Sequence, residues 1–183
     1  IALGLAAGFM EPLESTSIHM VHSGIFRLLS LMPLNDFDQA TIDEYNRLTQ
    51  IEYEQIRDFI ILHYKATTRD DAPFWAYCRD MAVPDTLAHR IDLFRSRARM
   101  ARHDDQLFIE PSWLAVFMGQ GIMPATYDPL ADVAPLGEIR QKLDDYKTLM
   151  SRIVSGMPTH EAFIERNCKA PPLSMSRLGG LAR

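Results

Sequence analysis

The residues best suited to chemistry lie between positions 9 and 19, where a proline-bounded loop runs into an apolar helical pattern. In this loop Glu14 is followed directly by the three hydroxyl residues Ser15, Thr16 and Ser17. Each of the three is a good N-cap, so we expect a helix to begin here. The first amides of a helix have no intrahelical acceptor and lie at the positive end of its dipole. The segment therefore predicts either an ordinary capped helix or a place where a small anion is held beside the Glu14 carboxylate.

The elements that must position these residues are helices, because apolar residues recur at spacings of three and four along most of the chain. Prolines divide these patterns, and those at 124, 129 and 135 predict an extended connector over 123–135. We find no internal repeat and no alternating strand pattern. The sequence thus predicts a mainly α body with helices over about 16–31, from 38 or 41 to 64, from 73, from 84 to 100, 110–118, 136–155 and 159–167.

Composition restricts the class of protein further. With 183 residues, 47% of them hydrophobic, the chain can bury one core. The net charge of −5 argues against nucleic acid as a partner, and five arginines between 90 and 102 alternate with apolar residues as a solvated helix face would. No apolar run reaches membrane-spanning length. Cys78 and Cys168 have no metal-ligand spacing, so we expect a reduced, cytoplasmic protein without a metal site.

The order of the residues adds a family resemblance. Residues 2–18 resemble the segment of flavin-dependent tryptophan halogenases that passes the isoalloxazine ring, and Pro-Leu-Glu-Ser-Thr is its specific core. Several separated blocks in the same order are much harder to obtain by chance than one motif. The resemblance extends over roughly residues 2–155, and its further blocks are Asp58-Phe59-Ile60 with His63-Tyr64, Arg69 to Trp75, Gly119 to Pro124, and Tyr127 to Asp132.

The resemblance implies a role in a larger enzyme. Family members are considerably longer, and their N-terminal half carries a GxGxxG nucleotide-binding fold and a catalytic lysine that these 183 residues lack. The chain is then the helical, substrate-side C-terminal part of an α/β FAD-binding flavoprotein of the monooxygenase and halogenase type. We divide it into a flavin and halide-site loop with the first helix (1–35), a helical substrate-binding module (36–167) and a loose tail (168–183).

The same resemblance implies the reaction and the partners. The enzyme would use FADH2, oxygen and chloride or bromide to halogenate a small, electron-rich, indole-like aromatic substrate. The enzyme would need a separate flavin reductase and the N-terminal FAD-binding part of the same polypeptide. A homodimer is compatible with the resemblance. Neither a membrane nor a nucleic acid is implied as a partner.

Residue roles follow from the matching positions. Glu14 matches the glutamate at the halogenating centre, where it assists the lysine or takes the proton from the substrate, and Ser15 matches the residue that links the substrate and flavin sites. The backbone amides of Thr16 and Ser17 match the halide site. The family usually has glycine where this chain has Ser17, so a side chain enters that pocket.

Leu5 and Ile18 match positions whose backbone touches the flavin ring. Glu11, His19 and His22 have residue types that ligate metals, but only the two histidines share a helix face. We therefore expect no metal at these positions.

The substrate is expected to differ from free tryptophan. Tryptophan-specific relatives carry a long, tyrosine-rich, acidic insertion in the region that corresponds to 100–112, which grips the amino acid, and here only a short connector is present. The sequence leaves two alternatives open: a flavin monooxygenase that hydroxylates without halide, and a helical interaction module without chemistry of its own. Trp75 and Trp113 are the remaining large aromatic residues, and for Trp75, beside Phe74 at a helix start, we favour core packing over a substrate box.

Overall fold

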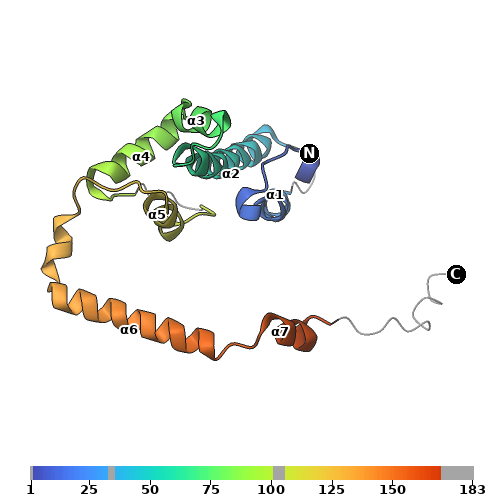
Figure 1. The fold of residues 1–183 in the computed structure, drawn as a ribbon. Helices are drawn as coiled ribbons and strands as arrows, with labels where there is room; N and C mark the ends of the chain where they lie inside the picture. The colour runs from blue at the N-terminus through green and yellow to red at the C-terminus, as the bar shows by residue number, and fades with distance from the viewer. Residues whose placement is uncertain (1, 33–35, 101–105, 170–183) are drawn as a thin grey trace. The chain divides into compact units, whose positions relative to one another are not determined.

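The computed structural model describes residues 2–32, 36–100 and 106–169, and within these residues all regular structure is helical (Figure 1). This confirms the mainly α expectation. Short 3-10 turns precede and interrupt the longer helices. The elements in chain order are η1 (Gly4–Ala6), η2 (Leu13–Ser15), α1 (Ser17–Ser30), α2 (Gln39–Lys65), α3 (Pro73–Asp80), α4 (Asp85–Arg97), α5 (Glu110–Gly119), η3 (Pro129–Val133), α6 (Leu136–Ser155) and α7 (His160–Asn167).

The chain forms two compact units, residues 1–128 and 129–183. The first unit holds η1, η2 and helices α1 to α5, and it contains the described buried residues. The second holds η3, α6 and α7. The division expected from the sequence, after residues 35 and 167, separates the expected flavin and halide site from the substrate-binding module and the tail. It is not based on compactness, and it stays a prediction.

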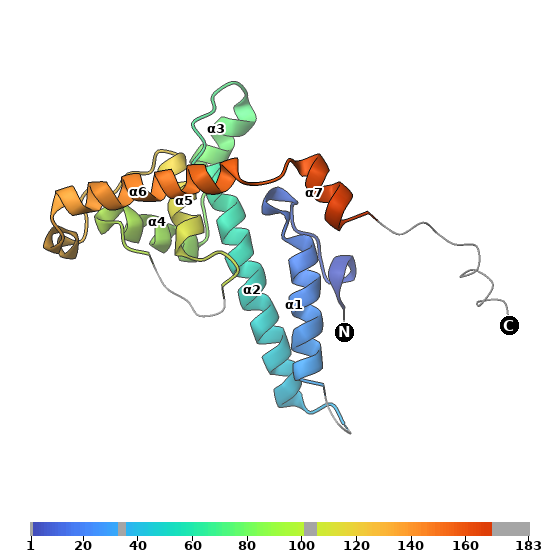
Figure 2. The same cartoon turned by 90° about the horizontal axis from the view of Figure 1, so that it is seen from below.

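Helices α1 and α2 lie side by side (Figure 2), joined by a polar cluster. Glu52 of α2 accepts hydrogen bonds from Arg27 at 3.0 Å and from Ser23 at 2.8 Å, both on α1. A Cβ added at Gly24 would lie 3.0 Å from Leu3, so the N-terminal segment packs closely against α1 where there is no side chain. The close approach at Gly24 thus holds Leu3 beside the middle of α1.

The main core lies where the C-terminal half of α2 meets α4 and α5. Its members come from helix faces with the predicted spacing, and apolar burial of this kind is the main term that stabilises a small helical unit. A smaller cluster of Met20, Ile56 and Ile60 joins α1 to α2. The main core consists of Phe59, Leu62, Leu87, Ile91, Phe94, Trp113, Phe117 and Ile122.

Most helix ends follow the sequence signals. Asp38 caps α2 by accepting from the Thr41 amide at 2.9 Å, and Thr159 caps α7. Helix α4 ends at Arg97 rather than near 100, because Ala98 adopts the left-handed conformation with φ 55°. The expected extended connector over 123–135 contains the 3-10 turn η3. The sequence His103-Asp104-Asp105 favours a break after this helix, and these three positions lie outside the described residues.

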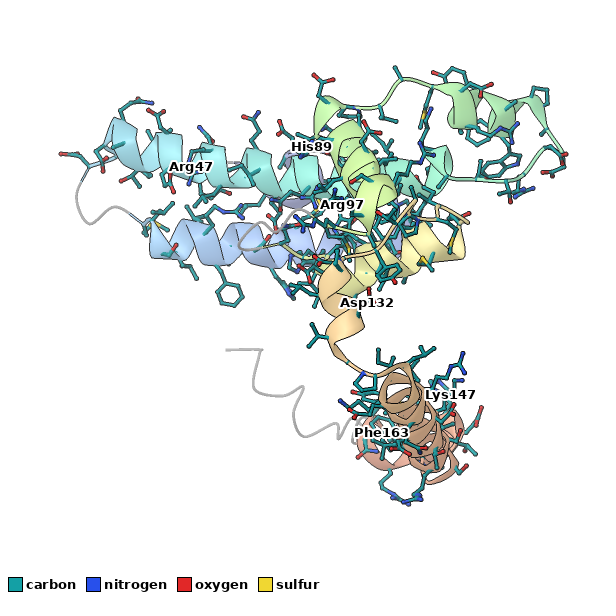
Figure 3. The ribbon with its side chains drawn as sticks, turned by 90° about the vertical axis from the view of Figure 1, so that its left-hand side faces the viewer. Arg47, His89, Arg97, Asp132, Lys147 and Phe163 are labelled. Atoms are coloured by element: carbon teal, nitrogen blue, oxygen red, sulfur yellow. The ribbon has the colours of Figure 1, made fainter. Side chains whose placement is uncertain are left out.

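In the second unit, α6 exposes side chains around its whole circumference (Figure 3), among them Lys147, and Phe163 of α7 is also exposed. The apolar stripe predicted for α6 is present at the expected spacing. Its residues are largely exposed in the described structure, as at Leu143, Tyr146 and Ile153.

Candidate active site at the start of α1

The loop before α1 has an unusual backbone. Glu14 and Ser15 have φ of 66° and 54°, the left-handed region that residues with a Cβ rarely occupy. Within the turn η2, the Ser15 amide donates to the Pro12 carbonyl at 2.8 Å. Such strain of about 1–3 kcal/mol for each residue persists only where surrounding contacts determine the conformation.

Two apolar side chains and one hydrogen bond anchor this loop. Met10 and Leu13 pack against the small cluster between α1 and α2. The Tyr64 hydroxyl of α2 donates to Glu11 Oε1 at 2.6 Å. This hydrogen bond, together with burial, raises the pKa of Tyr64 to about 12. The loop is therefore fixed to α2 on the N-terminal side of Glu14.

A second contact fixes Glu14 itself. Its Oε1 lies 2.9 Å from Nε2 of His63, the neighbour of Tyr64 on α2. The other ring nitrogen of His63, Nδ1, is hydrogen bonded to the Phe59 carbonyl at 2.8 Å. The ring also meets the buried Phe59 ring edge-on, with centroids 4.9 Å apart. The Glu14 side chain keeps 38% of its surface exposed, so the carboxylate is both held and accessible.

The start of α1 offers donors to an anion. Thr16 occupies the N-cap position but makes no side-chain cap, in contrast to the capping expected from the sequence. Its hydroxyl oxygen is buried and has no hydrogen-bond partner within the described residues. The amides of Ser17 and Ile18 lie in the first turn, where no intrahelical carbonyl can accept from them. Several N–H and O–H donors thus gather one residue beyond Ser15.

The predicted flavin-contact residues lie together beside this helix start. Leu5, Ser17 and Ile18 line a shallow cavity of about 110 Å³ that also includes Gly4 and Gly8. Leu5 and Ile18 are 80% and 71% exposed, which leaves an apolar surface open to a further group. The structure therefore brings together all six residues that the sequence singled out.

Other candidates have structural roles. The described residues contain no group of three metal-ligating side chains. His19 lies 3.2 Å from Glu52, and Trp113 is 3% exposed in the core, where its Nε1 donates to the Phe108 carbonyl. The expectation of a solvated arginine face is wrong for Arg90, which is buried with its guanidinium 4.6 Å from the Trp113 ring.

Two functional candidates carried no role in the sequence reasoning. His63 and Tyr64 occur in a block that matches the family. The partner of His63, Glu14, lies 49 positions earlier, and the partner of Tyr64, Glu11, lies 53 positions earlier. No spacing rule connects positions so far apart. Their position at the C-terminal end of α2 was predictable, whereas their contact with the loop was not.

Comparison with known proteins identifies the family of this chain. The family model for tryptophan halogenases matches residues 1–136. The chain belongs to the tryptophan halogenase family. Among curated relatives, the tryptophan 6-halogenase SttH of Streptomyces toxytricini is 32% identical over 140 residues, covering 73% of this chain and 27% of the relative.

Solved structures of flavin-dependent halogenases are more similar. Xcc4156 from Xanthomonas campestris is 44% identical with a TM-score of 0.88 and covers 95% of this chain and 35% of its own. BrvH from Brevundimonas sp. BAL3 is 41% identical with a TM-score of 0.84, over 90% of this chain and 34% of its own. The chain spans about a third of the length of the curated relatives it matches.

None of the described helices has the length and apolar character that crossing a membrane requires.

Proposed function

We propose that this chain forms the substrate-side part of a flavin-dependent halogenase that acts on an electron-rich, indole-like aromatic compound. Family membership and the similarity to flavin-dependent halogenases support the reaction class. The observation that carries the proposal is the accessible Glu14 carboxylate, held in a strained loop directly before a helix start that offers free donors.

Glu14 is the proposed general base. After an electrophilic halogen adds to an aromatic carbon, that carbon must lose its proton before aromaticity returns. A carboxylate at a fixed position accepts this proton, and its negative charge stabilises the cationic ring that precedes the loss. Ser15, next to it, is proposed to contact both the substrate and the flavin side of the site.

Thr16 and Ser17 are the proposed halide ligands. The first-turn amides of α1 favour an anion, since they are unpaired and lie at the positive end of the helix dipole. The buried Thr16 hydroxyl supports this role, because an unpaired buried donor costs about 1–3 kcal/mol that a bound halide would offset. The side chain of Ser17 would narrow the pocket on one side.

The flavin would lie against the exposed surface that includes Leu5 and Ile18. The residues present fit a flat ring on one face, since the surface is apolar and Gly4 and Gly8 add no side chain to it. When bound, reduced FAD with oxygen supplies the oxidation of the halide to hypohalous acid. The FAD-binding part of the polypeptide and a separate flavin reductase are the proposed partners.

Replacing Glu14 in the full-length protein tests this proposal. Glu14→Gln keeps the shape of the side chain but cannot take a proton, so we expect turnover to fall by about 10²-fold or more, the usual contribution of a general base. FAD affinity and thermal stability should remain near those of the parent. The measurement is halogenated product from indole with bromide or chloride, with a reductase supplying FADH2.

Glu11→Gln is the matched control, because it makes the same change three residues earlier and keeps an acceptor for Tyr64. Its turnover should stay within threefold of the parent. Turnover of Glu14→Gln within the same range would reject Glu14 as the base. Hydroxylated product without any halide requirement would instead identify a monooxygenase.

A further inference from the structure

We propose that His63 is the positioning residue for Glu14, and that its ring carries a proton on both nitrogens while it holds the carboxylate. The inference rests on the proposed function, in which Glu14 takes the proton of the substrate. It adds a second residue, from the far end of α2, on which the correct placement of that carboxylate depends.

The hydrogen bonding of the ring supports this protonation state. The Phe59 carbonyl oxygen is only an acceptor, so the 2.8 Å contact with Nδ1 requires a hydrogen on Nδ1. In a neutral ring Nε2 would then carry a lone pair, directed to the side on which Glu14 Oε1 lies 2.9 Å away. Two lone pairs repel at this distance, whereas an imidazolium attracts a carboxylate.

The environment of His63 limits its freedom. Its side chain is 16% exposed, and its ring is held edge-on by Phe59, which is itself stacked on Phe108 at 3.9 Å. A ring fixed in this way presents only its Nε2 atom to Glu14. The adjacent Tyr64 holds Glu11, so two consecutive residues of α2 fix two carboxylates of the loop.

The contact assigns different tasks to the two oxygens of Glu14. Oε1 faces His63, while Oε2 has no hydrogen-bond partner within the described residues. In the proposed reaction the C–H bond of the halogenated carbon breaks, its electron pair returns to the ring, and the proton goes to Oε2. His63 keeps both of its protons in this step, so it orients the base without exchanging a proton with the substrate.

Two amide substitutions in the full-length enzyme separate the two faces of the ring. In His63→Gln the terminal NH2 reaches the position of Nε2 and can still donate to Glu14. In His63→Asn the shorter amide reaches only the position of Nδ1. We expect kcat to fall at least tenfold in His63→Asn and at most threefold in His63→Gln, with the KM for indole unchanged within threefold.

Equal kcat in the two variants would overturn the proposal. The proposal would also be overturned if the variant with the larger loss of kcat had a correspondingly larger loss of thermal stability. His63 would then be only a structural residue. Thermal unfolding of both variants is therefore measured beside the kinetics.

A spectroscopic readout is independent of turnover. In full-length protein labelled with ¹⁵N-histidine at pH 7, the two ring nitrogens of His63, assigned by their loss in His63→Gln, should both be protonated. In Glu14→Gln one of them should lose its proton. A singly protonated ring in the parent would overturn the proposal. If the ring signals behave as expected but the parent makes no halogenated product, the proposed function fails and the ion pair stands.

Discussion

At the scale of single residues, the Tyr64 to Glu11 hydrogen bond couples the loop to pH. The carboxylate of Glu11 accepts the phenol proton and, with burial, raises the pKa of Tyr64 to about 12 from its usual 10. The folded state therefore binds this proton more tightly than the unfolded state. The contribution to stability is complete below pH 10 and declines as the pH rises towards 12.

We expect Tyr64→Phe to lower the free energy of unfolding by about 0.5–1.5 kcal/mol at pH 8, the usual net value of one hydrogen bond. The deficit relative to the parent should shrink at pH 11, where the parent loses part of the same contribution. Denaturant unfolding of Tyr64→Phe and of the parent at pH 8 and pH 11 measures this deficit in the free energy of unfolding. Tyr77→Phe, which changes a 69% exposed side chain, serves as the control and should show no deficit at either pH. A Tyr64→Phe deficit that grows with pH would contradict this assignment.

Residue types predicted a helix start at the hydroxyl run, which is a local signal, whereas Glu14 was singled out by the family resemblance. The left-handed backbone of Glu14 and Ser15 had no such signal, since neither is glycine or asparagine. The unpaired hydroxyl of Thr16 was also unexpected, because a threonine at this position normally caps the helix. Both features depend on tertiary contacts that propensities do not contain.

At the scale of elements, the end of α5 shows how a local signal fixes a core residue. The Gly121 amide donates to the Met118 carbonyl at 3.1 Å, and the Ile122 amide donates to the Phe117 carbonyl at 2.8 Å. With Gly121 at φ 76°, this is a Schellman motif. The motif turns the chain so that Ile122 enters the main core beside Phe117.

Two glycines at this helix end give opposite predictions. A Cβ would meet nothing within 4 Å at either Gly119 or Gly121, so packing does not distinguish them. Gly121→Ala should lower the free energy of unfolding by about 1 kcal/mol, because only this glycine has a positive φ. Gly119→Ala should raise it by about 0.5 kcal/mol through helix propensity. Urea denaturation of both variants is the measurement, and destabilisation by Gly119→Ala would show that α5 does not end as described.

Helix positions were largely predictable because the apolar spacing and the caps agree, as at Asp38 and Gly121. The short turns were not, because η2 and η3 contain too few residues to show a period. The burial of Arg90 was missed for a different reason. Charge patterning favoured a solvated side chain, whereas stacking on Trp113 and desolvation, which lowers the pKa of Arg90, indicate a buried one.

At the scale of the whole molecule, we propose that the connector between α4 and α5, residues 98–109, determines how the substrate is held. Its last part is occupied by packing: Phe108 stacks on Phe59, and its carbonyl accepts from Trp113. The connector contains no tyrosine that could hold the ammonium and carboxylate of an amino acid. We therefore propose a pocket that is open on this side.

In the full-length enzyme we expect indole to be preferred over free tryptophan, because a site without polar clamps gains nothing from a zwitterionic tail. Bromide should work at least as well as chloride, given the Ser17 side chain beside the proposed halide amides. A competition between the two substrates, run in bromide and in chloride, measures both. A clear preference for tryptophan with chloride would contradict both inferences.

The left-handed conformation of Glu14 also restricts how this position can evolve. Val, Ile and Thr, whose branched Cβ tolerates positive φ least, are disfavoured there by the backbone before any question of activity arises. Asp, Asn and Gly tolerate the conformation but shorten or remove the carboxylate that reaches His63. Substitutions at position 14 therefore either destabilise the fold or lose the contact with His63. The backbone conformation itself thus limits which residues can occur at this position.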